Sequence, residues 1–96
     1  MHTPEYYEKA EIKKYLDSIS AWHFSPVMAG YGKSGVSDII FCYRGHFGSI
    51  EVKREGKVPT KLQELRMQEV RKAGGFATWG TAGKVHVEIE KWIRGL

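Results

Sequence analysis

Apolar side chains near the amino-terminus recur at helical spacing. They lie three or four residues apart, which places them on one face of a helix. Thr3 is a suitable N-cap and Pro4 suits the first helical position. The pattern predicts an amphipathic helix from Pro4 to about Ser18. The side chains that define its apolar face are Ile12, Tyr15, Leu16 and Ile19.

The middle of the chain has the pattern of extended structure. Residues 22–31 predict a strand or extended segment that leads into a glycine-rich loop, 30–35. The glycine spacing in this loop does not match a nucleotide-binding P-loop. Two strands, 38–43 and 47–53, follow, and the turn residues 44–46 between them predict an antiparallel hairpin.

The second half of the chain predicts more helix. A charged loop, 54–59, leads into a helix over 60–73 that is closed by the glycines at 74–75. Residues 76–80 predict another strand. The tail, 84–93, fits the alternation of a strand and also the spacing of a helix, and we favour a terminal helix.

These elements predict an α/β fold. Their order is helix, three strands, helix, strand, helix, which suits a mixed central sheet of about four strands flanked by helices. The chain has 96 residues, and we expect residues 1–96 to form a single domain. A domain of this length buries only about 60–65% of its unfolded surface, so its core is lean.

Composition adds modest constraints. The net charge of +4 and the pI of about 9.3 are compatible with a nucleic-acid partner but occur in many small proteins. The one cysteine, Cys42, permits no disulfide within the chain, so we expect a reducing compartment and a buried structural thiol. No apolar stretch approaches the ~20 residues of a membrane helix. The amino-terminus does not resemble a signal peptide, and we expect a cytoplasmic protein without a membrane partner.

The hairpin brings polar side chains near one another. The turn places Asp38 across from residues 51–53. If Asp38 pairs with Glu51 or Lys53, all three side chains share one face; if it pairs with Val52, they separate, because side chains alternate along a strand. We expect convergence, since the other register would leave Glu51 and Lys53 among the apolar side chains of the first strand.

Converging carboxylates indicate a metal site. Asp38 and Glu51 would form a hard-oxygen site for Mg²⁺ or Mn²⁺, and the Val52 carbonyl could add a ligand. Lys53 beside the metal could orient or deprotonate a water, or stabilise charge on a scissile phosphate. The same residues also fit a structural role, in which Asp38 caps a strand and Glu51 and Lys53 form an ion pair.

Two further polar residues lie where they could join this site. Glu8 falls on the apolar stripe of the first helix, where a metal on the neighbouring sheet would explain a carboxylate; Glu11 is the alternative, and Glu8 could also reach solvent. Gln63 lies in the first turn of the second helix. It could position a phosphate or a metal-bound water there, or it could form a capping box with Thr60.

Basic and polar residues flank the proposed site in sequence. They could bind DNA phosphates, although solvated basic loops are an equal alternative. Nothing resembles a base-reading helix, so we expect recognition of DNA shape rather than sequence. The three tryptophans are expected to be core or interface anchors rather than platforms for base stacking. The candidate DNA-binding residues are Lys33, Ser34, Arg54, Lys57 and Lys61, and the tryptophans are Trp22, Trp79 and Trp92.

Four short runs, in this order and spacing, resemble the VRR-NUC family of the PD-(D/E)XK nuclease superfamily. The resemblance extends from the Glu8 helix to Trp92, and it departs from the family pattern at Ser37, where the family usually has proline. The altered residue is expected to change the rigidity of the approach to Asp38 rather than the chemistry. The runs are Gly35-Val36-Ser37-Asp38-Ile39-Ile40, Ile50-Glu51-Val52-Lys53, Thr60-Lys61-Leu62-Gln63 and Gly74-Gly75-Phe76.

This resemblance implies roles for the candidate residues. Asp38 and Glu51 would be the metal-binding carboxylates and Lys53 the catalytic lysine. Gln63 would be the helix glutamine that follows them, and Glu8 or Glu11 the early glutamate. The implied fold is restriction-endonuclease-like, and the implied cofactor is Mg²⁺ or Mn²⁺.

The resemblance also implies a substrate. Small stand-alone members of the family resemble homodimers that cut branched DNA such as four-way (Holliday) junctions, in the host cytoplasm where a phage encodes them. Two alternatives remain open at this point. One is a less selective or sequence-specific endonuclease of the restriction type, and the other is a DNA-binding module without catalysis.

Overall fold

The computed structural model describes residues 1–27 and 32–96, and there it confirms the predicted order of elements. The bounds agree with the sequence pattern to within two residues, except after residue 24. The predicted extended segment 22–31 is a strand only at its start, and its end lies outside the described residues. The elements are α1 (Pro4–Ser18), β1 (Trp22–Phe24), β2 (Ile39–Tyr43), β3 (His46–Val52), α2 (Lys61–Lys72), β4 (Phe76–Gly80) and α3 (Ala82–Arg94).

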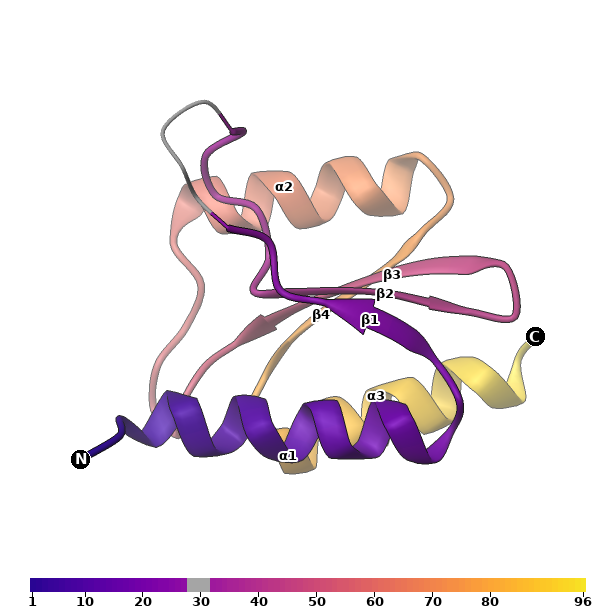
Figure 1. Cartoon of the computed structure of the whole chain (residues 1–96). Helices are drawn as coiled ribbons and strands as arrows, with labels where there is room; N and C mark the ends of the chain where they lie inside the picture. Colours follow the sequence, from indigo (N-terminus) through magenta and orange to yellow (C-terminus); the bar gives the residue numbers. More distant parts are fainter. Residues whose placement is uncertain (28–31) are drawn as a thin grey trace.

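The strands form one mixed sheet in the order β1-β2-β3-β4 (Figure 1). The pairs β1-β2 and β2-β3 are antiparallel, and β4 runs parallel to β3 after the crossover through α2. The hairpin turns at Arg44 and Gly45, whose φ angles of 48° and 84° are those of the tight turn that suits twisted strands. This turn fixes the register of β2 against β3, and the candidate site depends on that register.

The helices form a layer on each side of the sheet. Helices α1 and α3 pack together on one face, and α2 lies on the other face against β3 and β4 (Figure 1). The apolar core is between the sheet and the α1-α3 layer. Phe41 fits there because its ring lies over Gly48, where a Cβ would come within 2.1 Å of it. The fully buried apolar side chains of this core are Ile12, Leu16, Ile39, Phe41, Ile50, Val52, Val85 and Ile89.

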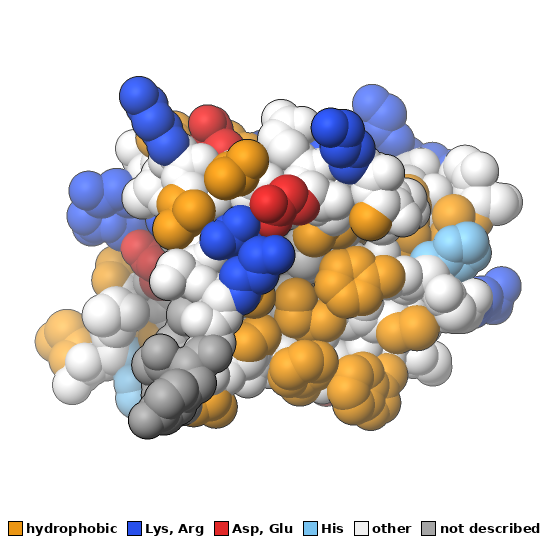
Figure 2. Space-filling view, turned by 90° about the horizontal axis from the view of Figure 1, so that it is seen from above, with side chains coloured by type: hydrophobic (Ala, Val, Ile, Leu, Met, Phe, Trp, Pro, Cys, Tyr) orange, Lys and Arg blue, Asp and Glu red, His pale blue; other side chains and the backbone are white. Residues whose placement is uncertain are grey.

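The sheet face on the side of α2 is only partly covered. Alternate residues of β1, β2 and β3 point to this face, and α2 packs over β3 and β4. Apolar side chains therefore remain exposed on it, as Figure 2 shows. Cys42 is one of them, so the prediction of a buried thiol is wrong: Cys42 lies beyond the part of the sheet that α2 covers. We call Trp22, Phe24, Cys42 and Phe47 the open sheet face.

The predicted terminal helix is confirmed and begins slightly earlier than expected. Thr81 caps it, since its Oγ1 accepts from the Lys84 N–H at 3.3 Å. The ambiguity of the tail is resolved by packing, because Val85 and Ile89 are fully buried and Trp92 stacks on Phe76. Among the described helices, none combines the length and the apolar character that a membrane crossing requires.

Candidate active site

Asp38 and Glu51 meet at the end of the hairpin, as predicted. The ladder pairs Ile39 with Ile50, and one further step places Asp38 opposite Glu51. The backbone N–H of Val52 donates to Oδ2 of Asp38 at 2.8 Å, which fixes the orientation of that carboxylate. Lys53 follows on the same side as Glu51, and its own N–H is bonded to the Gly80 carbonyl at 3.0 Å. The register that brings the three side chains together is therefore the observed one.

Glu51 is a buried carboxyl group in a difficult environment. The residue is only 3% exposed. Its Oε1 atom is buried and has no hydrogen-bond partner among the described residues. Burial, a hydrogen bond with Asp38 and repulsion by the Asp38 carboxylate together raise the pKa of Glu51 to about 9, and the Lys53 ammonium opposes this rise. Two carboxylates can share such a bond only if one carries a proton, so the pair as a whole favours binding a proton.

The donor atoms at this site fit a hard divalent cation. Glu51 and Asp38 provide oxygens from two carboxylates, and the Val52 carbonyl is the predicted third ligand. Within residues 1–27 and 32–96, no group of three or more His, Cys, Asp and Glu side chains is arranged to hold a metal. Mg²⁺ commonly uses one or two carboxylates and keeps several waters, so a pair is sufficient for it. The bare Oε1 of Glu51 is the atom that such an ion would satisfy.

The acids of α1 have other positions than the sequence suggested. Oε1 of Glu8 accepts from the Ala82 N–H at 2.9 Å, so Glu8 caps α3 and the structure does not bring it to the carboxylate pair. Glu11 is exposed beside Tyr15, away from the pair. The first-helix acid whose charge does act on Glu51 is Glu5. Sequence reasoning gave Glu5 no place in the candidate site, although its three-residue spacing from Glu8 puts both on one side of α1.

Gln63 forms the capping box that was one of its two predicted roles. The Thr60 N–H donates to Oε1 of Gln63 at 2.9 Å, and the Gln63 N–H donates to Oγ1 of Thr60 at 3.2 Å. Together the two bonds cap the amino-terminus of α2. The side-chain oxygen of Gln63 is thus committed to the helix cap in this structure.

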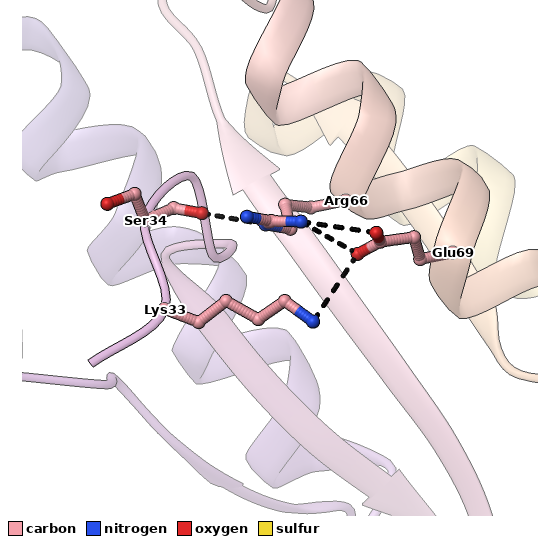
Figure 3. A network of polar contacts seen from close by, with 4 residues as sticks. All are labelled: Lys33, Ser34, Arg66 and Glu69. Carbon is pink, nitrogen blue, oxygen red and sulfur yellow. Dashed lines mark hydrogen bonds and ion pairs between the residues drawn. The ribbon is translucent and has the colours of Figure 1, made fainter.

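Two of the candidate DNA-binding residues belong to a network with α2 (Figure 3). The Arg66 guanidinium donates to both carboxylate oxygens of Glu69 at 3.1 Å and to the Ser34 carbonyl at 2.7 Å. The Lys33 ammonium lies 3.7 Å from Oε1 of Glu69. These contacts tie the loop at 33–34 to the helix, so Lys33 is already partnered before any DNA binds.

The other basic candidates lie in the loop that follows β3 and at the start of α2. Arg54 and Lys57 line a cavity beside β4, and the turn between them is closed by a bond from the Lys57 N–H to the Arg54 carbonyl at 3.1 Å. Lys61 is exposed at the first residue of α2. Trp79 and Lys84 join Arg54 and Lys57 in this cavity. Sequence reasoning did not connect them, because only the parallel pairing of β3 with β4 brings them together.

Comparison with solved structures identifies a relative of this fold. A structure described as a VRR_NUC domain superposes with a TM-score of 0.78 at 24% sequence identity, over 93% of this chain and 97% of that chain. No family model matches the sequence. No curated protein matches it either. The chain thus has the fold of a VRR_NUC domain, and the predicted resemblance is confirmed at the level of the fold.

Proposed function

We propose that this chain is a metal-dependent endonuclease that hydrolyses DNA phosphodiester bonds at Asp38, Glu51 and Lys53. The observation that carries the proposal is the unpartnered Oε1 of Glu51, buried beside a second carboxylate. A buried pair of this kind is tolerated when one carboxyl holds a proton or when a cation binds between the two. The shared fold with a VRR_NUC domain adds support, since that name denotes a nuclease domain.

The three side chains have distinct parts in this chemistry. Asp38 and Glu51 would hold Mg²⁺ or Mn²⁺, and the bond from the Val52 N–H keeps Asp38 in place for it. The bound ion supplies a Lewis acid for the phosphate and a water of lowered pKa. Lys53 contributes a positive charge on the same side of the strand, where it stabilises the charge that develops on the phosphate. Water adds to phosphorus, the P–O bond to one nucleotide breaks, and a proton passes to the leaving oxygen.

Cleavage of a four-way junction tests the lysine. Purified protein with Mn²⁺ should cut the junction, EDTA should stop the reaction, and Lys53→Ala should lower the rate by about 10²–10³-fold. The matched control is Lys72→Ala, an exposed lysine at the end of α2, which should cut at the wild-type rate. Equal rates for the Lys53 and Lys72 variants would reject the assignment.

Branched DNA is the substrate that we propose, on the basis of the family resemblance. The competing outcome is an endonuclease that cuts linear duplex as well as it cuts a junction. Rates measured on both substrates at equal concentration separate the two, and a lack of preference for the junction would exclude structure selectivity. If neither is cut and calorimetry detects no Mn²⁺ binding, the chain is a DNA-binding module without catalysis.

We further propose a homodimer that associates through the open sheet face. Trp22 is 67% exposed and Phe47 is 46% exposed on this face, and contiguous exposed apolar groups mark association surfaces. Resolution of a junction requires cuts in two strands, and a symmetric dimer would present one active site to each of them. Sedimentation should show a dimer for the wild type and a monomer for Trp22→Lys. Tyr7→Lys, at an exposed aromatic residue of α1, is the control that should remain dimeric, and a monomeric wild type would refute the proposal.

We also propose a cytoplasmic location, since an exposed free thiol such as that of Cys42 suits a reducing compartment.

A further inference from the structure

A cavity adjoins the candidate active site on the side of β4, and its walls combine apolar surface with cationic side chains. It has a volume of about 320 Å³ and is enclosed by the loop at 54–58, the end of β4 and the start of α3. The parallel register pairs Glu51 with Trp79 and Val52 with Gly80, so the cavity begins one strand away from the carboxylate pair. That separation is about 5 Å between backbones. A ligand that occupies the active site can therefore extend into this cavity.

The lining of the cavity is basic. Arg54, Lys57 and Lys84 contribute three cations, and Glu55 is the acid among the lining residues. Arg54 follows Lys53 directly in the chain, so the basic residues of the cavity begin next to the active-site lysine in sequence. Several cations of this kind suit a chain of phosphates better than a single small anion.

Lys84 packs against an aromatic ring at the start of α3. It lies in the first turn of α3, where a cation opposes the helix dipole. Its ammonium lies 3.3 Å from the centre of the Trp79 ring, and burial lowers the pKa of Lys84. Among the ion pairs of the described residues, none includes Lys84. The ammonium lies against an aromatic ring, and the nearby Glu88 carboxylate attracts it without forming an ion pair, so the charge remains available to an anionic ligand.

We propose that this cavity is a subsite for the DNA backbone next to the scissile phosphate, in which Arg54, Lys57 and Lys84 contact phosphates and Trp79 supports Lys84 and packs against the strand. The inference rests on the proposed nuclease function. Half-buried aromatic side chains beside cations are a common arrangement for holding a nucleic-acid strand without reading its sequence. This proposed role differs from the expectation that Trp79 is a core or interface anchor.

The contribution of Lys84 can be measured without cleavage. Binding of a fluorescently labelled four-way junction is followed by anisotropy in EDTA, at a series of salt concentrations, for wild type and Lys84→Gln. Loss of one phosphate contact should weaken binding by about fivefold to tenfold and reduce the slope of log K against log salt by about 0.9. Lys84→Arg, which keeps the charge and can stack on Trp79, should have the affinity and the salt slope of the wild type.

The control is Lys91→Gln, an exposed lysine in the last turn of α3, which should keep the wild-type affinity and slope. If Lys84→Gln behaves like Lys91→Gln, the subsite does not exist as proposed. Trp79→Leu gives a second reading: it should weaken binding when its thermal melt shows a folded protein, and wild-type affinity in a folded variant would also overturn the inference. This binding assay contains no metal and does not depend on cleavage. A protein that binds DNA here but does not cut it with Mn²⁺ would refute the nuclease proposal, and the test of the subsite would remain valid.

Discussion

Glu51 and Glu69 are two carboxylates of the same small domain with opposite surroundings. Glu69 is exposed on α2, and hydrogen bonds from Arg66, together with the nearby Lys33 ammonium, lower its pKa. Glu51 is buried at the end of β3, and burial and Asp38 raise its pKa. The fold places Glu69 beside two cations, whereas it buries Glu51 beside another carboxylate.

This contrast separates an acid with structural partners from one that we propose binds a metal ion. The Glu69 network ties a loop to a helix and needs no further ligand (Figure 3). The Glu51 pair is a local violation of good packing, with a buried oxygen left bare. Such violations are expected where a protein binds a ligand, because the ligand completes the arrangement. Matched substitutions at Glu51 and Glu69 can therefore test whether the buried pair binds a ligand.

The largest expected effect is on metal binding when Glu51 becomes neutral. Glu51→Gln should weaken Mn²⁺ binding by at least about 100-fold, because a direct carboxylate ligand is lost. Titration calorimetry measures this, with Glu69→Gln as the matched control that should bind Mn²⁺ like the wild type. Similar losses in both variants would mean that general charge, rather than the buried pair, attracts the ion.

The next effect is on the pH dependence of stability without metal. The folded pKa of Glu51, about 9, lies above its ordinary value of 4.5. The folded state then binds the proton more tightly than the unfolded chain, so the stabilisation is complete below about pH 4.5 and is lost as pH rises toward 9. The wild type should lose up to on the order of 1 kcal/mol per pH unit relative to Glu51→Gln in that window.

Denaturant unfolding in EDTA across this pH range gives the measurement. Added Mn²⁺ should reverse the loss, because the ion takes the place of the proton and binds more tightly as pH rises. If the wild type and Glu51→Gln unfold with parallel pH profiles, Glu51 does not hold a proton in the folded state.

A smaller effect is expected at Glu8. Glu8→Ala removes the acceptor for the Ala82 N–H and should destabilise the protein by about 1 kcal/mol, as loss of a helix cap does. Its Mn²⁺ affinity should equal that of the wild type, because Glu8 is not at the carboxylate pair. Thermal melting and calorimetry read the two properties separately. A clear fall in Mn²⁺ affinity would restore the role that sequence spacing suggested for Glu8.

The hairpin explains why the centre of the site was predictable. Side chains alternate with a period of two, and the turn at 44–45 leaves few registers, so the meeting of Asp38 and Glu51 followed from local pattern. The capping box of Gln63 is also local, and the sequence gives both of its residues. Here pattern and structure agree because the determining contacts lie within a few residues or one hairpin.

The remaining features depend on contacts that are distant in sequence. Glu8 accepts a hydrogen bond from the N–H of Ala82, 74 positions later, and the sequence pattern of α1 does not predict that partner. Cys42 is exposed because α2 lies over β3 and β4, and this lateral position follows from the path of the chain rather than from the apolar run around the cysteine. Trp79 comes beside Glu51 only through the parallel pairing of β3 with β4.

The smallest effect is expected at Glu69, and its sign is opposite to that at Glu51. The folded pKa of Glu69 is lowered, so its charge stabilises the protein above the ordinary pKa, and this contribution disappears as pH falls through the folded pKa. Exposed ion pairs contribute little, so Glu69→Gln should melt within about 3 °C of the wild type at pH 7, slightly below it, and the gap should close in acid. Melting curves at pH 7 and at acid pH test this. A gap that widens in acid would show that Glu69, like Glu51, is held against its own charge.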